Sequence, residues 1–240
     1  MESKLAPVFR GMLVCAFALI CLSAVAVAQD KKDQGPQISG DERNALEKLV
    51  KAQGLEAKTK AAAEYAKKFP KGVKRADVAA TISNEIYKIQ DINQKLKAAE
   101  EFSKIFNQPG ESDLVRPSLI EGYFATNKFD EALNESAKYL EKNPEDVTIH
   151  VQITWAGATQ TQKQAATPSL MKAAVESAAK GAELMEADKK PSWMADDKWK
   201  DYKNSWLWRL YYARGVVLYQ NKEKEAAKES LEKAVGLESN

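Results

Sequence analysis

The sequence predicts an all-α protein, a stack of about five antiparallel helical hairpins, and three observations support this fold class. The 240 residues include 36 Ala and 30 Lys, a composition that favours helix over sheet. From Asp41 onward, apolar residues recur at spacings of three and four, and no segment alternates as a strand would. A similar segment also returns after 34 residues, as expected when one supersecondary unit is repeated.

The repetition is clearest when residues 95–105 are placed over residues 129–139. Ala98 then falls on Ala132, and Ile105 falls on Tyr139, both at an offset of 34. A small residue recurring with larger residues beyond it suits a helix crossing, because the small side chain lets the two axes approach closely.

The segment around Tyr123 resembles the tetratricopeptide repeat family, in which Tyr, Ala and Pro stand nine and then twelve residues apart. Tyr123, Ala132 and Pro144 have this spacing. The resemblance implies a right-handed solenoid of paired helices over residues 41–238. Applied to the other repeats, it assigns repeat-packing roles to five further residues: Ala98, Phe102, Gly215, Ala227 and Ala234.

Ten helices are expected, with boundaries uncertain by about two to four residues. They span residues 41–53, 56–69, 75–91, 94–107, 113–127, 129–142, 146–161, 168–187, 201–220 and 222–237. Three prolines, Pro70, Pro109 and Pro144, stand where second helices should end, and two, Pro117 and Pro168, suit first turns.

Local capping and spacing add two further expectations. Asp113 and Thr167 are expected to be N-caps. Ala132 and Ala227 are 95 residues apart, which is not a multiple of 34, so the fourth hairpin should carry insertions at 161–167 and 188–200.

Residues 1–28 are predicted to be a secretory signal peptide. Lys4 and Arg10 precede an uncharged apolar run, and Ala26-Val27-Ala28 forms a cleavage site before Gln29. Residues 29–40, with two glycines and a proline, are expected to be a flexible linker. The protein would then be exported to the periplasm or secreted, without stable membrane insertion after cleavage. The alternative is an uncleaved membrane anchor, since the apolar run is near the shortest that spans a bilayer.

Charge and composition weigh against several kinds of partner and cofactor. The net charge is +2, and basic and acidic residues are interleaved, which is not the clustered basic excess of a nucleic-acid binder. Both cysteines, Cys15 and Cys21, lie within the predicted signal peptide, so the mature chain would hold no disulfide and no thiolate metal site. No phosphate-binding or dinucleotide motif occurs, so we expect no cofactor and no metal.

No catalytic set is evident, and we expect the protein not to be an enzyme. His150 is the single histidine, and no nucleophile elbow accompanies it. Glu100-Glu101 and Asp196-Asp197 are adjacent on expected helices, where neighbouring side chains diverge by about 100°. An enzyme with a site assembled across hairpins remains the alternative.

Aromatic residues give the main functional indication. Four of the five tryptophans, Trp193, Trp199, Trp206 and Trp208, lie within 16 residues, close to several tyrosines. They could pack an extended hairpin or form a recognition surface, because Trp and Tyr are favoured interface anchors.

The family resemblance implies that the first helix of each hairpin lines a groove. The candidate partner-binding residues on these helices are Tyr87, Glu121, Phe124, Trp155, Tyr212 and Tyr219. We therefore expect an exported, non-enzymatic scaffold that binds a protein or peptide in the cell envelope. The alternative is an envelope module that binds a glycan or small ligand through the aromatics of residues 193–212.

Overall fold

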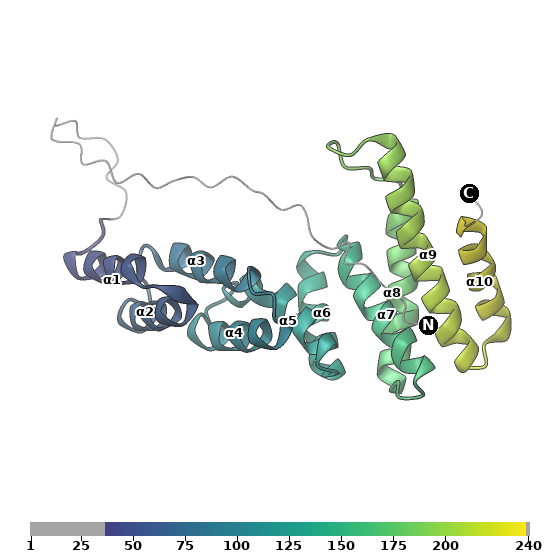
Figure 1. Cartoon of the computed structure of the whole chain (residues 1–240), viewed down its shortest axis with the longest axis horizontal. Helices are drawn as coiled ribbons and strands as arrows, with labels where there is room; N and C mark the ends of the chain where they lie inside the picture. The colour runs from purple at the N-terminus through teal and green to yellow at the C-terminus, as the bar shows by residue number, and fades with distance from the viewer. Residues whose placement is uncertain (1–36, 239–240) are drawn as a thin grey trace. The chain divides into compact units, whose positions relative to one another are not determined.

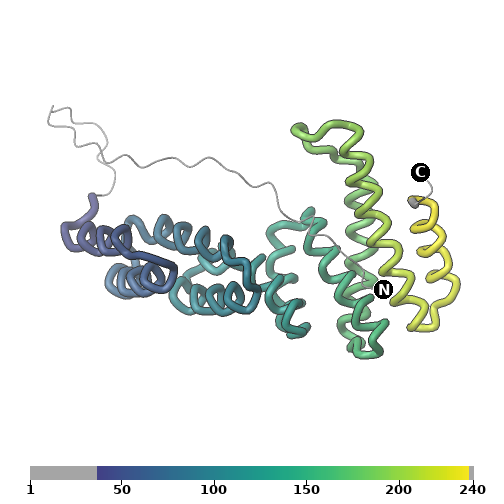
Figure 2. Tube along the Cα trace, in the orientation of Figure 1, coloured from purple at the N-terminus to yellow at the C-terminus, as the bar shows by residue number. Residues whose placement is uncertain are grey.

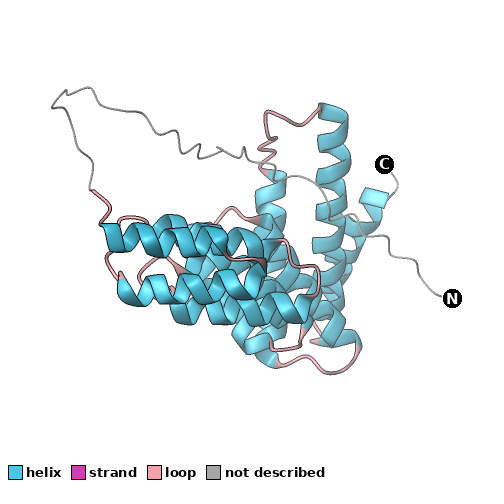
Figure 3. Ribbon diagram, turned by 60° about the vertical axis from the view of Figure 1, so that its left-hand side comes forward, coloured by secondary structure: helices cyan, strands magenta, loops and turns pink. Residues whose placement is uncertain are grey.

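The computed structural model describes residues 37–238, and this part of the chain confirms the all-α prediction (Figure 1; Figure 3). The described residues form ten α-helices and one 3₁₀ helix, with loops but no strand between them. The helices are α1 Gly40–Lys51, α2 Gly54–Lys68, α3 Arg75–Tyr87, α4 Ile92–Ile105, η1 Ser112–Val115, α5 Arg116–Ala125, α6 Phe129–Lys142, α7 Val147–Gln162, α8 Pro168–Glu186, α9 Asp196–Gln220 and α10 Lys224–Glu238.

The predicted signal peptide, residues 1–28, lies outside the described residues, as does most of the predicted linker. Residues 37–39 have no regular structure, and Gly40 is the first residue of α1. Ser39 caps this helix by accepting a hydrogen bond from the Glu42 N–H.

The helices pair as five consecutive hairpins, as the spacing of apolar residues predicted. Each odd-numbered helix packs against the next even-numbered one, and Figure 2 follows the chain through this succession. Neighbouring hairpins also touch: α2 packs on α3, α4 on α5, and both α7 and α8 on α9. Apolar residues from successive hairpins therefore share common clusters, which stabilise one hairpin against the next.

Most helix boundaries follow local chemistry, but one expected N-cap was wrong. Thr167 caps α8 as expected, because its hydroxyl accepts the Leu170 N–H at 3.3 Å. Pro117 and Pro168 both lie in first turns. The expectation that Asp113 caps a helix was wrong, since it lies within η1 and α5 begins only at Arg116. The Asp113 carboxylate instead pairs with Arg116 and Lys142.

The hairpin formed by α7 and α8 is followed by a long helix. α9 begins at Asp196, five residues before the expected start, and extends for 25 residues. Figure 1 shows its first turns rising together with the loop that follows α8. Trp199 and Lys203 of α9 hold this loop through Asp188. The Trp199 indole Nε1 and the Lys203 Nζ each donate a hydrogen bond of 2.8 Å to the Asp188 carboxylate.

A buried arginine joins three elements near the start of α3. The Arg75 Nε and Nη2 donate to the Glu111 carboxylate at 2.6 and 2.9 Å, and both side chains are largely buried. Its remaining donors reach the carbonyls of Ala66 and Ile105, at 3.0 and 3.3 Å, near the ends of α2 and α4. Because helix ends leave carbonyls without partners, this one side chain satisfies two ends at once.

A second buried arginine, Arg116, occupies the equivalent first position of α5. It pairs with Asp113 at 2.7 Å and with Glu135 of α6. Burial of these charges is tolerable because each has a partner and hydrogen bonds.

Glycines within α7 and α9 set the closest helix contacts of the later hairpins. A Cβ added at Gly157 would lie 2.3 Å from the Cβ of Ala174, so α7 and α8 approach too closely for any side chain there. A Cβ at Gly215 would lie 2.6 Å from the Cγ of Leu231, where α9 meets α10. Small residues thus set the helix separation, as close packing requires.

Candidate partner-binding surface

Two of the six predicted partner-binding residues meet on the surface of α7 and α9. The rings of Trp155 and Tyr212 have centroids 6.4 Å apart, and Trp208 stacks on Tyr212 at 5.2 Å with an angle of 4° between the planes. Trp155 is 42% exposed, whereas Trp208 and Tyr212 are half-buried. These three residues are called the aromatic patch below.

The helix that presents Trp155 carries no Asp, Glu, Lys or Arg along its 16 residues. Its opposite side is buried, and the accessible residues recur at helical spacing. They are Thr148, Gln152, Trp155, Ala156, Thr159 and Gln162. Gln162 links the two helices, because its Nε2 donates to the Tyr212 hydroxyl at 3.4 Å.

α9 continues the same kind of surface. Its accessible uncharged residues on the side of Trp208 are Ser205, Trp208, Tyr212, Val216 and Tyr219. Together with the accessible residues of α7, they are called the neutral surface. The accessible Arg209 borders this row on α9, with its guanidinium 5.7 Å from the ring centroid of Trp206. Tyr219, another predicted binding residue, is 65% exposed and lies two turns beyond Tyr212.

The remaining three predicted residues lie elsewhere, on α3 and α5. Tyr87 is partly exposed and donates its hydroxyl hydrogen to the Leu114 carbonyl at 3.0 Å, and partial burial raises its pKa. Glu121 is exposed and accepts from Lys95 Nζ at 3.1 Å. Phe124 is half-buried against a cluster that includes Ile120 and Ile149. Among the described residues, no ring contact joins Tyr87 or Phe124 to the aromatic patch.

The aromatic residues from 193 to 212 divide between core and surface, so packing explains part of this cluster, and a recognition surface stays a prediction for the exposed part. Trp206 and Tyr211 are buried and pack in the core of the last two hairpins. Burial, together with a hydrogen bond to Glu186, raises the pKa of Tyr211 well above its usual value. Trp193 is 70% exposed and Tyr202 is 41% exposed.

The predicted repeat-packing residues also differ in burial. Five of them are buried: Phe102, Ala132, Gly215, Ala227 and Ala234. Ala98 is half-buried beside the fully buried Ala99, and Tyr123 is half-buried beneath Lys128. Burial, followed by the nearby Glu100, raises the pKa of Tyr123 to about 12. Pro144 is exposed in the turn between α6 and α7.

His150 is buried in α7, where burial lowers its pKa below the usual value. The adjacent acidic residues of α4 and α9 are solvated or paired with lysines, as Glu100 is with Lys128 and Asp196 with Lys190. Within residues 37–238, no group of three or more His, Cys, Asp or Glu side chains could hold a metal ion.

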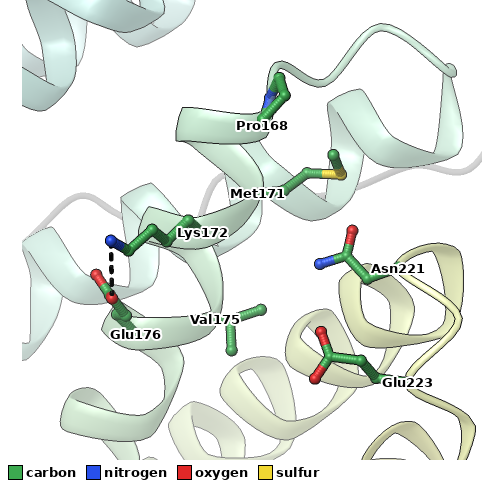
Figure 4. Close-up of a pocket in the computed structure, with 7 residues that line it drawn as sticks. All are labelled: Pro168, Met171, Lys172, Val175, Glu176, Asn221 and Glu223. Atoms are coloured by element: carbon green, nitrogen blue, oxygen red, sulfur yellow. Dashed lines mark ion pairs between the residues drawn. The ribbon is translucent and has the colours of Figure 1, made fainter.

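A pocket lies between α8 and the turn that joins α9 to α10 (Figure 4). Met171 and Val175 form its apolar wall, and the exposed Lys172–Glu176 pair, 3.9 Å apart, lies at its side. None of the six predicted partner-binding residues lines this pocket.

A second, polar hollow lies among α4, α5 and α6. It is lined by Arg116, Tyr123 and Glu135 among others, and the Arg116 guanidinium is paired with the Glu135 carboxylate.

Comparison with known proteins supports the fold. No protein-family model matches the chain, and no curated protein matches it. Among solved structures, it is similar to one described as the crystal structure of MamA protein. The TM-score is 0.50 at 10% identity, over 82% of this chain and 92% of the other. A MamA RS-1 ArsTM double mutant gives a TM-score of 0.47 at 11% identity, over 82% and 93%.

The similarity to MamA concerns the path of the backbone, because the sequences share only one residue in ten. Together with the five hairpins, it agrees with the tetratricopeptide-like solenoid predicted from Tyr123, Ala132 and Pro144. Between residues 37 and 238, no helix combines the length and the apolar character needed to cross a membrane.

Proposed function

We propose that the protein is an exported, non-enzymatic scaffold that binds a protein partner through the neutral surface of α7 and α9. The observation that carries this proposal is the meeting of Trp155, Trp208 and Tyr212 at an accessible surface. Aromatic side chains bury a large area while losing few torsions, which makes them effective anchors for a partner.

The chemistry of the surface suits binding rather than catalysis. The amides and hydroxyls around the patch can donate and accept hydrogen bonds, but none is a strong acid, base or nucleophile at neutral pH. A partner segment would therefore be held by burial of aromatic rings and by hydrogen bonds, without covalent chemistry.

Affinity purification of the tagged protein from cell envelopes tests the scaffold proposal. We expect wild type to retain a partner that also binds directly when both proteins are purified, and Tyr212→Ala to lose it. Tyr202→Ala is the matched control, because Tyr202 is also a partly exposed tyrosine of α9 but lies outside the aromatic patch. Equal recovery by all three proteins, or no partner with any, would count against the proposal.

Export is the second part of the proposal, and it rests on the charge, apolar length and Ala26-Val27-Ala28 ending of the N-terminal segment. The intact mass of the protein isolated from its native cells provides the test. Loss of residues 1–28, leaving Gln29 at the N-terminus, is the expected result. A full-length protein retained in membranes would support the uncleaved anchor instead.

A further inference from the structure

We infer that the partner segment recognised by the neutral surface is an extended stretch of polypeptide without charged side chains, about seven residues long. This inference rests on the proposed scaffold function and specifies the chemistry of the partner. Three features of α7 and α9 lead to it: their lack of charge, the length of the accessible side of α7, and the geometry of the aromatic rings.

The lack of charge is unusual for this chain. Charged residues make up 29% of the sequence, yet α7 has none, and the row of Trp208, Tyr212 and Tyr219 on α9 has none; the accessible Arg209 beside this row has its guanidinium over the ring of Trp206 instead. A charged partner residue buried here would lose its hydration without gaining a counter-ion, which is strongly unfavourable. An uncharged segment meets no such penalty, and Thr159 and Gln162 can hydrogen-bond its peptide groups.

The length of the segment follows from the helix it would lie along. A helix of 16 residues is about 24 Å long at 1.5 Å per residue. An extended chain advances about 3.3 Å per residue, so about seven residues cover the accessible side of α7. Thr148 and Gln162 mark the two ends of this side.

Ring geometry favours a polypeptide over a glycan. A sugar ring binds best on an open aromatic face, but Trp208 and Tyr212 are stacked nearly parallel, so each covers one face of the other. Trp155 is tilted by 39° from Tyr212, which gives an uneven apolar surface instead of a flat platform. Apolar side chains of a peptide can fill such a surface, since they need no ring stacking.

Selection from a phage-displayed library of random dodecapeptides, using the intact protein, tests this inference. We expect the selected sequences to share a core of about seven residues depleted in Asp, Glu, Lys and Arg. Synthetic peptides carrying that core should lose affinity about tenfold or more with Tyr212→Ala or Trp155→Ala. Tyr202→Ala should bind as wild type does.

A second variant tests charge directly without removing an aromatic ring. Gln162→Glu is nearly isosteric and exposed, so the fold should be retained. We expect Gln162→Glu to bind the uncharged peptide more weakly than wild type does. A peptide carrying one central Lys should instead bind Gln162→Glu better than it binds wild type. Circular dichroism of each variant confirms that it is folded.

The outcomes separate this inference from the proposed function. Selected peptides that carry a charged core, or that bind Tyr212→Ala unchanged, would overturn the inference while leaving a scaffold in place. Failure to select any peptide, together with failure to recover a partner, would contradict both. Chitohexaose that quenches tryptophan fluorescence saturably in wild type, but not in Trp155→Ala, would instead indicate a glycan and overturn the inference.

Discussion

The first six helices, α1 to α6, are joined around two buried arginines, whereas the last four, α7 to α10, have no buried arginine and pack through glycine and apolar contacts. Arg75 and Arg116 each stand at the start of a first helix and reach carboxylates on other elements. In the later hairpins, Gly157 and Gly215 allow direct contact with the next helix. A glycine contact of the same kind also occurs in α5, where a Cβ at Gly122 would lie 2.7 Å from the Cβ of Leu96.

Ion pairs show the same difference. The Arg75–Glu111 pair has side chains only 8% and 13% exposed, while the Lys172–Glu176 and Lys228–Glu232 pairs are mostly solvated. Surface pairs contribute little to stability, so α7 to α10 depend on shape and apolar contact. Because apolar contacts hold these hairpins together, α7 needs no charged residues for packing, and its accessible side is neutral.

The largest expected effect comes from removing the buried guanidinium. Arg75→Met should lower the free energy of unfolding by about 3–5 kcal/mol, because Glu111 would remain buried without its cation. Burial by itself would raise the pKa of Glu111, and hydrogen bonds from Arg75 and Gln108 reverse this and hold it below its usual value. Urea unfolding measures the change.

Arg209→Met is the control for this prediction. Arg209 lies over the ring of Trp206 at 5.7 Å without a comparable buried carboxylate partner, so the loss should stay below about 1 kcal/mol. Equal losses for the two variants would show that the arginine-centred packing of α1 to α6 has been overestimated.

These long-range contacts also explain what the sequence could and could not predict. Pro117, Pro168 and Thr167 signal helix starts through local geometry, so ten helices and their order were predictable. The buried ion pair of Arg75 was not predicted, because its partner Glu111 lies 36 residues away in the sequence and no local pattern indicates the contact. Asp113 was misassigned because it lies within a 3₁₀ turn, and α5 begins only after this turn ends.

The second prediction concerns the glycine contact between α7 and α8. Gly157→Ala should destabilise the protein by about 2 kcal/mol, because the new methyl group would overlap Ala174 and the helices must separate. The double variant Gly157→Ala with Ala174→Gly should recover nearly all of this loss, because the helix cost of glycine is moved from α7 to α8 and is not added. Thermal unfolding of both variants measures the effect.

Gly236→Ala provides the opposite expectation. A Cβ at Gly236 meets no atom within 4 Å, so alanine should stabilise α10 by up to about 1 kcal/mol. Stabilisation by Gly157→Ala as well would mean that α7 and α8 do not require a glycine for their approach.

For the surface, the sequence placed Trp155 and Tyr212 on first helices by transferring the repeat register. It could not show that Trp208 joins them, nor that Trp206, only two residues away, faces the core. Both depend on how α9 is rotated against α7, which local spacing alone leaves open.

The smallest expected effect is on pH dependence and arises from His150 in the uncharged helix. Burial lowers its pKa, so the unfolded chain takes up the proton first as the pH falls. Stability should be fully present above pH of about 6.5 and should decline as the pH drops below that value. Unlike Arg75, a charged His150 would lack a buried ion-pair partner.

Urea unfolding between pH 7.5 and 5.5 checks this expectation, with His150→Gln as the comparison. The variant should lose less stability across this range than wild type, since glutamine does not titrate. Equal slopes for the two proteins would contradict a neutral, buried His150.

Site-specific photocrosslinking in living cells tests the central claim, that α7 and α9 present the partner-binding surface, most directly. Benzoylphenylalanine would replace Trp155 in one variant and Tyr202 in another, since the two side chains are 42% and 41% exposed. We expect a discrete crosslinked protein at position 155 and none at position 202. The same product at both positions, or a product only at position 202, would contradict it.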